Sequence, residues 1–65
     1  MFRQFKLLIN LPFLKKGKEF VFDDETGYVY AILDGKQSDI PLRRGLAGYL
    51  WLLMTEKKYL KRIDA

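Results

Sequence analysis

Two short polar segments that contain glycine constrain the fold of this chain more than any other feature. DDETG, at residues 23–27, has the length that closes a β-hairpin through a type I turn followed by a left-handed glycine. Asp34-Gly35 is a second hairpin signal, because apolar residues precede it and the pair suits a two-residue turn. Together the two turns predict consecutive hairpins in the first two thirds of the chain.

The segments beside these turns show the two-residue period of β-strands. Residues 18–22 alternate on one side of the first turn, and residues 28–33 follow on the other. Both faces of the second segment are apolar, which is typical of a central strand. Residues 36–40 are short and polar, as edge strands often are. The sequence therefore predicts an antiparallel meander.

The N-terminal segment allows two interpretations. Residues 5–11 alternate between apolar and other positions, which favours a strand. A short helix is the alternative, since Phe2, Phe5 and Ile9 share one helical face. Pro12 ends either element, and Gly17 is the expected turn residue of the connection that follows.

The C-terminal third is predicted to be a helix. Ser38 or Asp39 is a candidate cap, Pro41 suits the first turn, and the apolar pattern continues to about Ile63. The expected architecture is ββββα, or βββα, an α+β domain over residues 1–65 with the helix on one face of the sheet. A chain of this size buries only about 60% of its unfolded surface, so it needs a dense apolar core.

The predicted helix is apolar all round in its first half, which raises the question of what covers its outer side. Helical periodicity directs one set of residues to the sheet: Tyr49, Leu52, Leu53, Tyr59, Leu60 and Ile63. Trp51, the single tryptophan, and Met54 are expected on the outside. Either the loop at residues 12–17 folds over Trp51, or Trp51 contacts another chain, where tryptophan and arginine often anchor binding.

Positive charge is concentrated in the predicted helix. Residues 1–40 carry six Lys/Arg and six Asp/Glu, whereas residues 41–65 carry six Lys/Arg against two acidic residues, which accounts for the net charge of +4. Arg43 and Arg44 lie at the helix start, where they would form an anion cradle with free N–H groups or remain solvated. Lys58 and Arg62 suit the dipole at the helix end.

Several function classes are excluded or disfavoured by composition. The chain has no cysteine and no histidine, so it offers no thiolate or imidazole as nucleophile, general base or metal ligand. DDETG lacks the spaced ligands of a calcium loop, and Lys15, Lys16 and Lys18 around Gly17 lack the pattern of a phosphate loop. No signal peptide or membrane span is recognisable. We expect a cytoplasmic protein that is not an enzyme and has no cofactor, metal or small-molecule substrate.

Two functions follow as expectations. The first is a protein-interaction module, self-associating or bound to a larger partner, that uses the outer face of its helix. The second is a nucleic-acid-binding accessory protein that uses the basic C-terminal segment, where phosphate contacts would make binding depend steeply on salt. The candidate partner-binding residues are Trp51, Met54, Arg43, Arg44, Lys58 and Arg62.

The aromatic residues of the first hairpin have two possible roles. Phe20, Phe22, Tyr28 and Tyr30 lie on adjacent predicted strands, as do the rings on which some RNA-binding sheets stack bases. The helix must cover one face of the same sheet, however, so a place in the core is the favoured interpretation.

Overall fold

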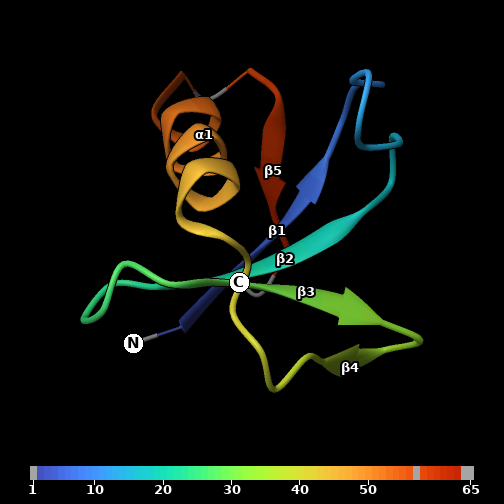
Figure 1. The fold of residues 1–65 in the computed structure, drawn as a ribbon. Helices are drawn as coiled ribbons and strands as arrows, with labels where there is room; N and C mark the ends of the chain where they lie inside the picture. The colour runs from blue at the N-terminus through green and yellow to red at the C-terminus, as the bar shows by residue number, and fades with distance from the viewer. Residues whose placement is uncertain (1, 57, 64–65) are drawn as a thin grey trace.

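The computed structural model describes residues 2–56 and 58–63, which form a five-stranded antiparallel sheet with one helix packed on it (Figure 1). In chain order the elements are β1 (Phe2–Leu7), β2 (Glu19–Asp23), β3 (Val29–Leu33), β4 (Lys36–Gln37), α1 (Arg44–Glu56) and β5 (Leu60–Arg62). The predicted α+β class, with a helix on one face of a small antiparallel sheet, is confirmed.

The strand order is β4-β3-β2-β1-β5, so the first four strands form the predicted meander. β2 lies in the middle, where Phe20 pairs with Phe5 on one side and with Ala31 on the other. β3 is internal, as its two apolar faces indicated, although it is not the central strand. The polar β4 forms one edge, in agreement with the prediction.

Both predicted turns are present with the expected backbone. Gly27 has a φ of 79° and closes the first hairpin, where its N–H donates to the carbonyl of Asp23 at 2.8 Å. Asp34 and Gly35 have φ values of 52° and 79°. Positive φ at both central residues defines a type I′ turn, which matches the right-handed twist of the flanking strands.

The N-terminal segment is a strand, and the helical alternative is wrong. β1 begins earlier than expected and ends at Leu7, because the chain turns back there. The Leu7 carbonyl accepts a hydrogen bond from Gly17 N–H at 2.9 Å, and Leu11 and Leu14 form a small bridge within the loop. Alternation beyond Leu7 therefore reflects loop packing and not strand pairing.

The helix begins at Arg44, three residues after the predicted first turn at Pro41. Leu42 N–H donates to the Val29 carbonyl at 2.8 Å, which holds the chain extended beside β3. Ser38 uses its hydroxyl in a local turn with Ile40 N–H at 3.2 Å, so it does not cap the helix. The first helical hydrogen bond is accepted by the carbonyl of Arg43.

The helix ends at Glu56, and the predicted continuation to Ile63 is wrong. Leu60–Arg62 forms β5, which pairs with β1 so that Leu60 lies opposite Leu7. The carbonyl of Tyr59 accepts from Leu8 N–H at 2.8 Å, and Ile63 N–H donates to Gln4 at 2.9 Å. These contacts with the exposed edge of β1 replace the helical hydrogen bonds that the local pattern predicted.

The core lies between α1 and the sheet. It consists of Phe5, Leu7, Phe20, Phe22, Val29, Ala47, Leu50, Leu53 and Leu60. The predicted inner face of the helix is rotated relative to the observed one, because Leu52 is 58% exposed and Tyr49 is also exposed. Ala47 and Leu50 take their places against the sheet.

Candidate interaction surface

Trp51 faces the sheet, contrary to the prediction. Its ring meets Phe22 edge to face with centroids 5.0 Å apart, and its indole N–H donates to the Gly27 carbonyl at 2.8 Å. The guanidinium carbon of Arg3 lies 5.9 Å from the ring centroid, within the range of a cation–π contact. Neither the loop at residues 12–17 nor a second chain is needed to explain its half-buried state.

Met54 is also turned inward and packs against the core. It borders a groove of about 380 Å³ whose lining includes Arg3, Leu60 and Arg62. The outward placement predicted for Trp51 and Met54 is therefore wrong. The two side chains help to attach the helix to the sheet and are only partly exposed, each bordering a groove.

The outer side of α1 carries a different set of apolar residues. Leu52 is 58% exposed, and Tyr49 lies one turn before it. The ring of Phe13, from the β1–β2 loop, meets the Tyr49 ring with centroids 5.5 Å apart. Gly45 and Gly48 share this side, and a Cβ built on either one meets no atom within 4 Å. We call Phe13, Tyr49 and Leu52 the helix patch.

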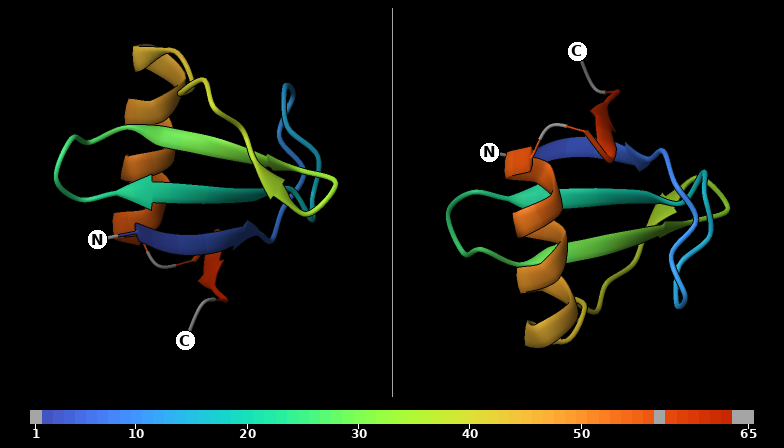
Figure 2. Two further views of the ribbon diagram at one scale, coloured as in Figure 1. Left: turned by 90° about the horizontal axis from the view of Figure 1, so that it is seen from below. Right: turned by 90° about the horizontal axis from the view of Figure 1, so that it is seen from above.

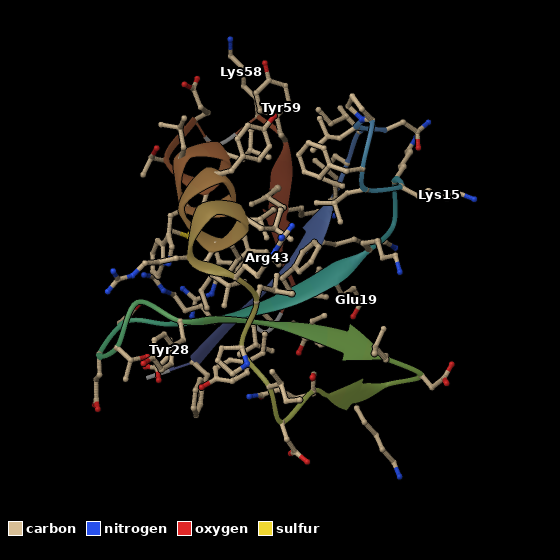
Figure 3. The ribbon with its side chains drawn as sticks, viewed as in Figure 1. Lys15, Glu19, Tyr28, Arg43, Lys58 and Tyr59 are labelled. Atoms are coloured by element: carbon tan, nitrogen blue, oxygen red, sulfur yellow. The ribbon has the colours of Figure 1, made fainter. Side chains whose placement is uncertain are left out.

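The four predicted cationic residues do not form one cluster. Arg43 and Arg44 lie at the start of α1, whereas Lys58 and Arg62 follow its end, as the labels of Arg43 and Lys58 show in Figure 3. A 13-residue helix is about 20 Å long. A single phosphate or carboxylate therefore cannot bridge the two pairs.

The start of the helix borders a second groove. Arg44, Trp51 and Tyr28 contribute to the lining of this space of about 410 Å³. The first turn of α1 contains no acidic residue, so its N–H dipoles and the arginines carry positive charge together. Both arginine side chains are exposed to solvent.

Arg43 occupies the N-cap position, where it has no side-chain acceptor for the free helix N–H groups. We expect Arg43→Asp to stabilise the fold by about 1 kcal/mol, because the carboxylate would cap the first turn and oppose the dipole. The midpoint of thermal unfolding, followed by circular dichroism, should rise by about 4–8 °C. Lys36→Asp makes the same charge change at an exposed strand position. An equal rise in both variants would attribute the effect to net charge and contradict capping.

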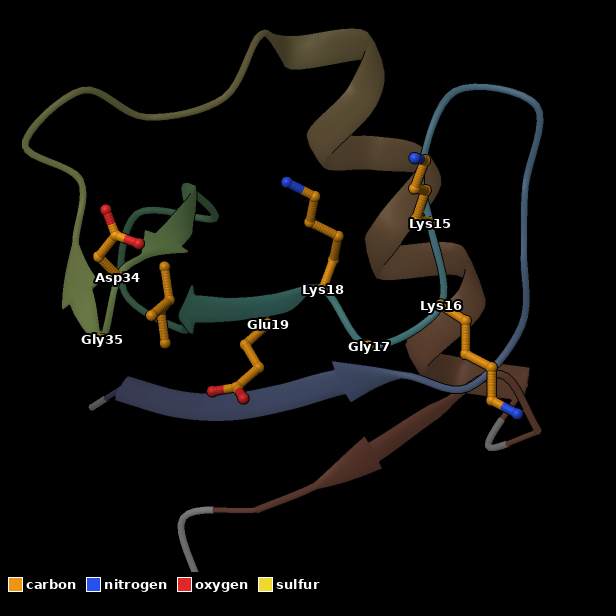
Figure 4. Close-up of a pocket in the computed structure, with 8 residues that line it drawn as sticks. Lys15, Lys16, Gly17, Lys18, Glu19, Asp34 and Gly35 are labelled. Carbon is orange, nitrogen blue, oxygen red and sulfur yellow. The ribbon is translucent and has the colours of Figure 1, made fainter.

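The lysines of the β1–β2 loop surround a hollow of about 380 Å³ at the other end of the sheet (Figure 4). Lys15, Lys16 and Lys18 share its lining with the carboxylate residues Glu19 and Asp34. Figure 4 shows Lys18 and Glu19 directed away from each other. The acidic residues offset much of the positive charge there, so the hollow lacks the uniform charge of a phosphate site.

The acidic segment at residues 23–27 is a turn, as expected. Partial burial raises the pKa of Asp23, but hydrogen bonds from Glu25 N–H at 3.0 Å and the Thr26 hydroxyl at 3.0 Å leave that pKa lowered overall. The charged carboxylate thus stabilises the turn at neutral pH, and this contribution is lost as the pH falls through the lowered pKa. Within the described residues no group of three or more acidic side chains is arranged to hold a metal ion.

The helix patch was not predicted from the sequence, because the predicted orientation of the helix about its own axis was wrong. It also left Tyr28 and Tyr30 with the core, whereas only Phe20 and Phe22 of the four hairpin aromatics belong to it. The register of the hairpin separates the two pairs: Tyr30 lies opposite Val21, whereas Phe20 and Phe22 lie opposite Ala31 and Val29. Because successive side chains of a strand point to opposite faces, the tyrosine rings are on the other face from the phenylalanine rings.

Comparison with known proteins provides no further assignment. No family model matches the chain, and no curated protein or solved structure matches it either. No helix in the described part of the chain has the length and apolar character that crossing a membrane requires.

Proposed function

We propose that this chain is a small protein-interaction module that binds its partner through the outer face of α1. The observation that supports this most strongly is the helix patch, in which Tyr49 and Leu52 lie one turn apart and Phe13 extends the surface. Contiguous exposed apolar residues on a small domain are typical of sites that bind other proteins.

The shape of this surface favours a protein partner with an apolar ridge. Gly45, Gly48 and Leu52 follow one another along the same side of α1. The glycines present only backbone, so a partner could approach the helix axis closely and place side chains beside Leu52 and Tyr49. Arg44 precedes Gly45 at the start of α1 and would contribute a charged contact at the rim of the interface.

Affinity purification from the cells that make the protein tests this proposal. Leu52→Glu places a charge in the helix patch while changing an exposed side chain, so the fold should persist within about 0.5 kcal/mol. We expect a protein that is retained by the wild-type chain to be lost with Leu52→Glu.

Ile40→Glu is the matched control, because Ile40 is 76% exposed and lies in the segment that connects β4 and α1. The same protein should be retained by this variant. Equal recovery with Leu52→Glu and wild type would contradict the helix patch as the binding surface.

A further inference from the structure

The turn between β3 and β4 contains the single Asp-Gly pair of the sequence, Asp34-Gly35. Both views of Figure 2 show this turn at the end of the sheet that lies away from α1. Figure 4 shows Asp34 and Gly35 side by side there, and both residues are exposed. A Cβ built on Gly35 meets no atom within 4 Å, so open space surrounds this residue. Water therefore reaches the turn freely.

The reactive groups of this pair have no partner in the described part of the chain. The Asp34 carboxylate forms no hydrogen bond or ion pair there, and the Gly35 N–H makes no backbone hydrogen bond. Two other aspartates are held by contacts, since Asp23 accepts two hydrogen bonds and Asp24 pairs with an arginine. The carboxyl group of Asp34 is therefore free to rotate toward the nitrogen that follows it.

The backbone of Asp34 has a φ that suits a five-membered imide ring. In such a ring the Gly35 nitrogen eclipses Cβ of Asp34, which for an L-residue sets ψ at about −120°, the value at the first central residue of a type II′ turn. That position also has a φ of about +60°, and Asp34 has a φ of 52°. Rotation of the peptide plane between the two residues then completes the geometry. Glycine accepts φ of either sign, and type II′ turns also close hairpins, so the strands can stay paired.

We propose that Asp34-Gly35 is a self-modification site, at which the chain isomerises to isoaspartate through a succinimide. The Gly35 nitrogen attacks Cγ of the protonated Asp34 carboxyl group. The N–Cγ bond forms, a Cγ–O bond breaks, and the peptide proton leaves with the carboxyl hydroxyl as water. Solvent water then opens the ring at either carbonyl. Cleavage of the new N–Cγ bond restores aspartate, whereas cleavage of the original peptide bond leaves the main chain running through the side-chain carboxyl.

Isomerisation should loosen the edge of the sheet without unfolding the domain. Isoaspartate adds one atom to the main chain, so the two-residue turn is lost. β4 depends on this turn, because its register with β3 consists of Ile32 opposite Gln37 and Leu33 opposite Lys36. No residue of β4 belongs to the core. The change would therefore uncover the edge of β3, which β4 protects from pairing with other chains. This inference does not rest on the function proposed for the helix patch.

Incubation of the purified chain at physiological temperature and pH, followed by mass spectrometry of its proteolytic peptides, tests the inference. We expect one form of the Asp34 peptide to be lighter by one water molecule, and another to have unchanged mass but fragments that locate isoaspartate at this position. Asp39 is the internal control, because it is exposed but precedes the β-branched Ile40, whose N–H donates to Ser38 Oγ at 3.2 Å. It should stay unmodified over the same time.

Two variants separate the chemistry from the turn. Asp34→Asn retains a side chain that tolerates positive φ and forms the same ring with release of ammonia. A neutral amide is a better electrophile than an ionised carboxylate, so modification should be roughly tenfold faster, which corresponds to a barrier lower by about 1.4 kcal/mol. Asp34→Gly removes the electrophile, and its Gly-Gly pair suits a type I′ turn. This variant should show neither the loss of water nor the isomer, and circular dichroism verifies folding.

Hydrogen exchange of the isomerised chain tests the structural consequence. The Ser38 amide, which donates to the Ala31 carbonyl at 2.9 Å, should exchange faster, whereas the Leu42 amide, bonded to Val29, should not change. Isoaspartate that forms in concentrated urea but not in the native chain would overturn the inference, because the folded turn would then prevent ring closure. Equal modification of Asp39 would also overturn it, since the turn would have no part in the reaction.

Discussion

Phe22→Ala is expected to remove most of the stability of this domain. Phe22 is fully buried in the central strand, and its ring meets Phe5 at 5.2 Å and Trp51 at 5.0 Å. Truncation of a buried phenylalanine costs about 3–5 kcal/mol. A domain of this length has a total stability of roughly 3–10 kcal/mol. We therefore expect a chain that is partly unfolded at 25 °C and lacks a steep thermal transition.

Urea unfolding followed by Trp51 fluorescence measures this effect, since the indole ring contacts Phe22 directly. Leu33→Ala is the control, because Leu33 ends the neighbouring strand and is 55% exposed. Its unfolding midpoint should stay close to that of the wild type. Phe22→Leu retains part of the side chain and keeps the measurement possible if the alanine variant does not fold. A loss below about 1 kcal/mol in Phe22→Ala would contradict the central place of this ring.

The hairpins could be predicted from the sequence because local backbone chemistry determines them. Gly27 and Gly35 adopt positive φ, and Asp34 is a residue that tolerates it. Once these turns are placed, strand period and polarity give the meander and the polar edge strand. None of these steps depends on a contact between distant parts of the chain.

The ends of the helix could not be predicted in the same way, because contacts distant in sequence determine them. Pro41 has the local features of a helix start, yet a hydrogen bond between Leu42 and Val29 keeps that segment extended. The rotation of the helix follows from the same cause. Trp51 is held against Phe22 and Gly27, and no local pattern contains that information.

The sequence predicted an exposed apolar surface on the helix but not the residues that form it. An apolar helix start did indicate more apolar surface than one sheet face can cover, and the helix patch bears exposed apolar residues. With the helix rotated, Leu52 and Tyr49 form that surface in place of Trp51 and Met54. The exposure of Tyr28 was not predicted for a different reason: Tyr28 and Tyr30 were assigned to the core together with Phe20 and Phe22.

Leu60→Ala is expected to destabilise the fold by about 2–5 kcal/mol, as leucine truncations in cores do. Leu60 is 5% exposed and lies opposite Leu7 where β5 pairs with β1. Ile63→Ala should cost much less, since Ile63 is 38% exposed. Thermal and urea unfolding of both variants measures the difference.

This pair of variants distinguishes β5 from the helix that the apolar pattern predicted. In a continued helix Leu60 and Ile63 would share the inner face, and truncating either one would carry a similar cost. In the strand, alternation and the end of pairing leave Leu60 alone in the core. Equal losses of unfolding free energy in the two variants would therefore favour a continued helix and contradict the assignment of β5. A large loss confined to Leu60→Ala would show that the C-terminal segment completes the sheet by covering the edge of β1, which the meander alone leaves open.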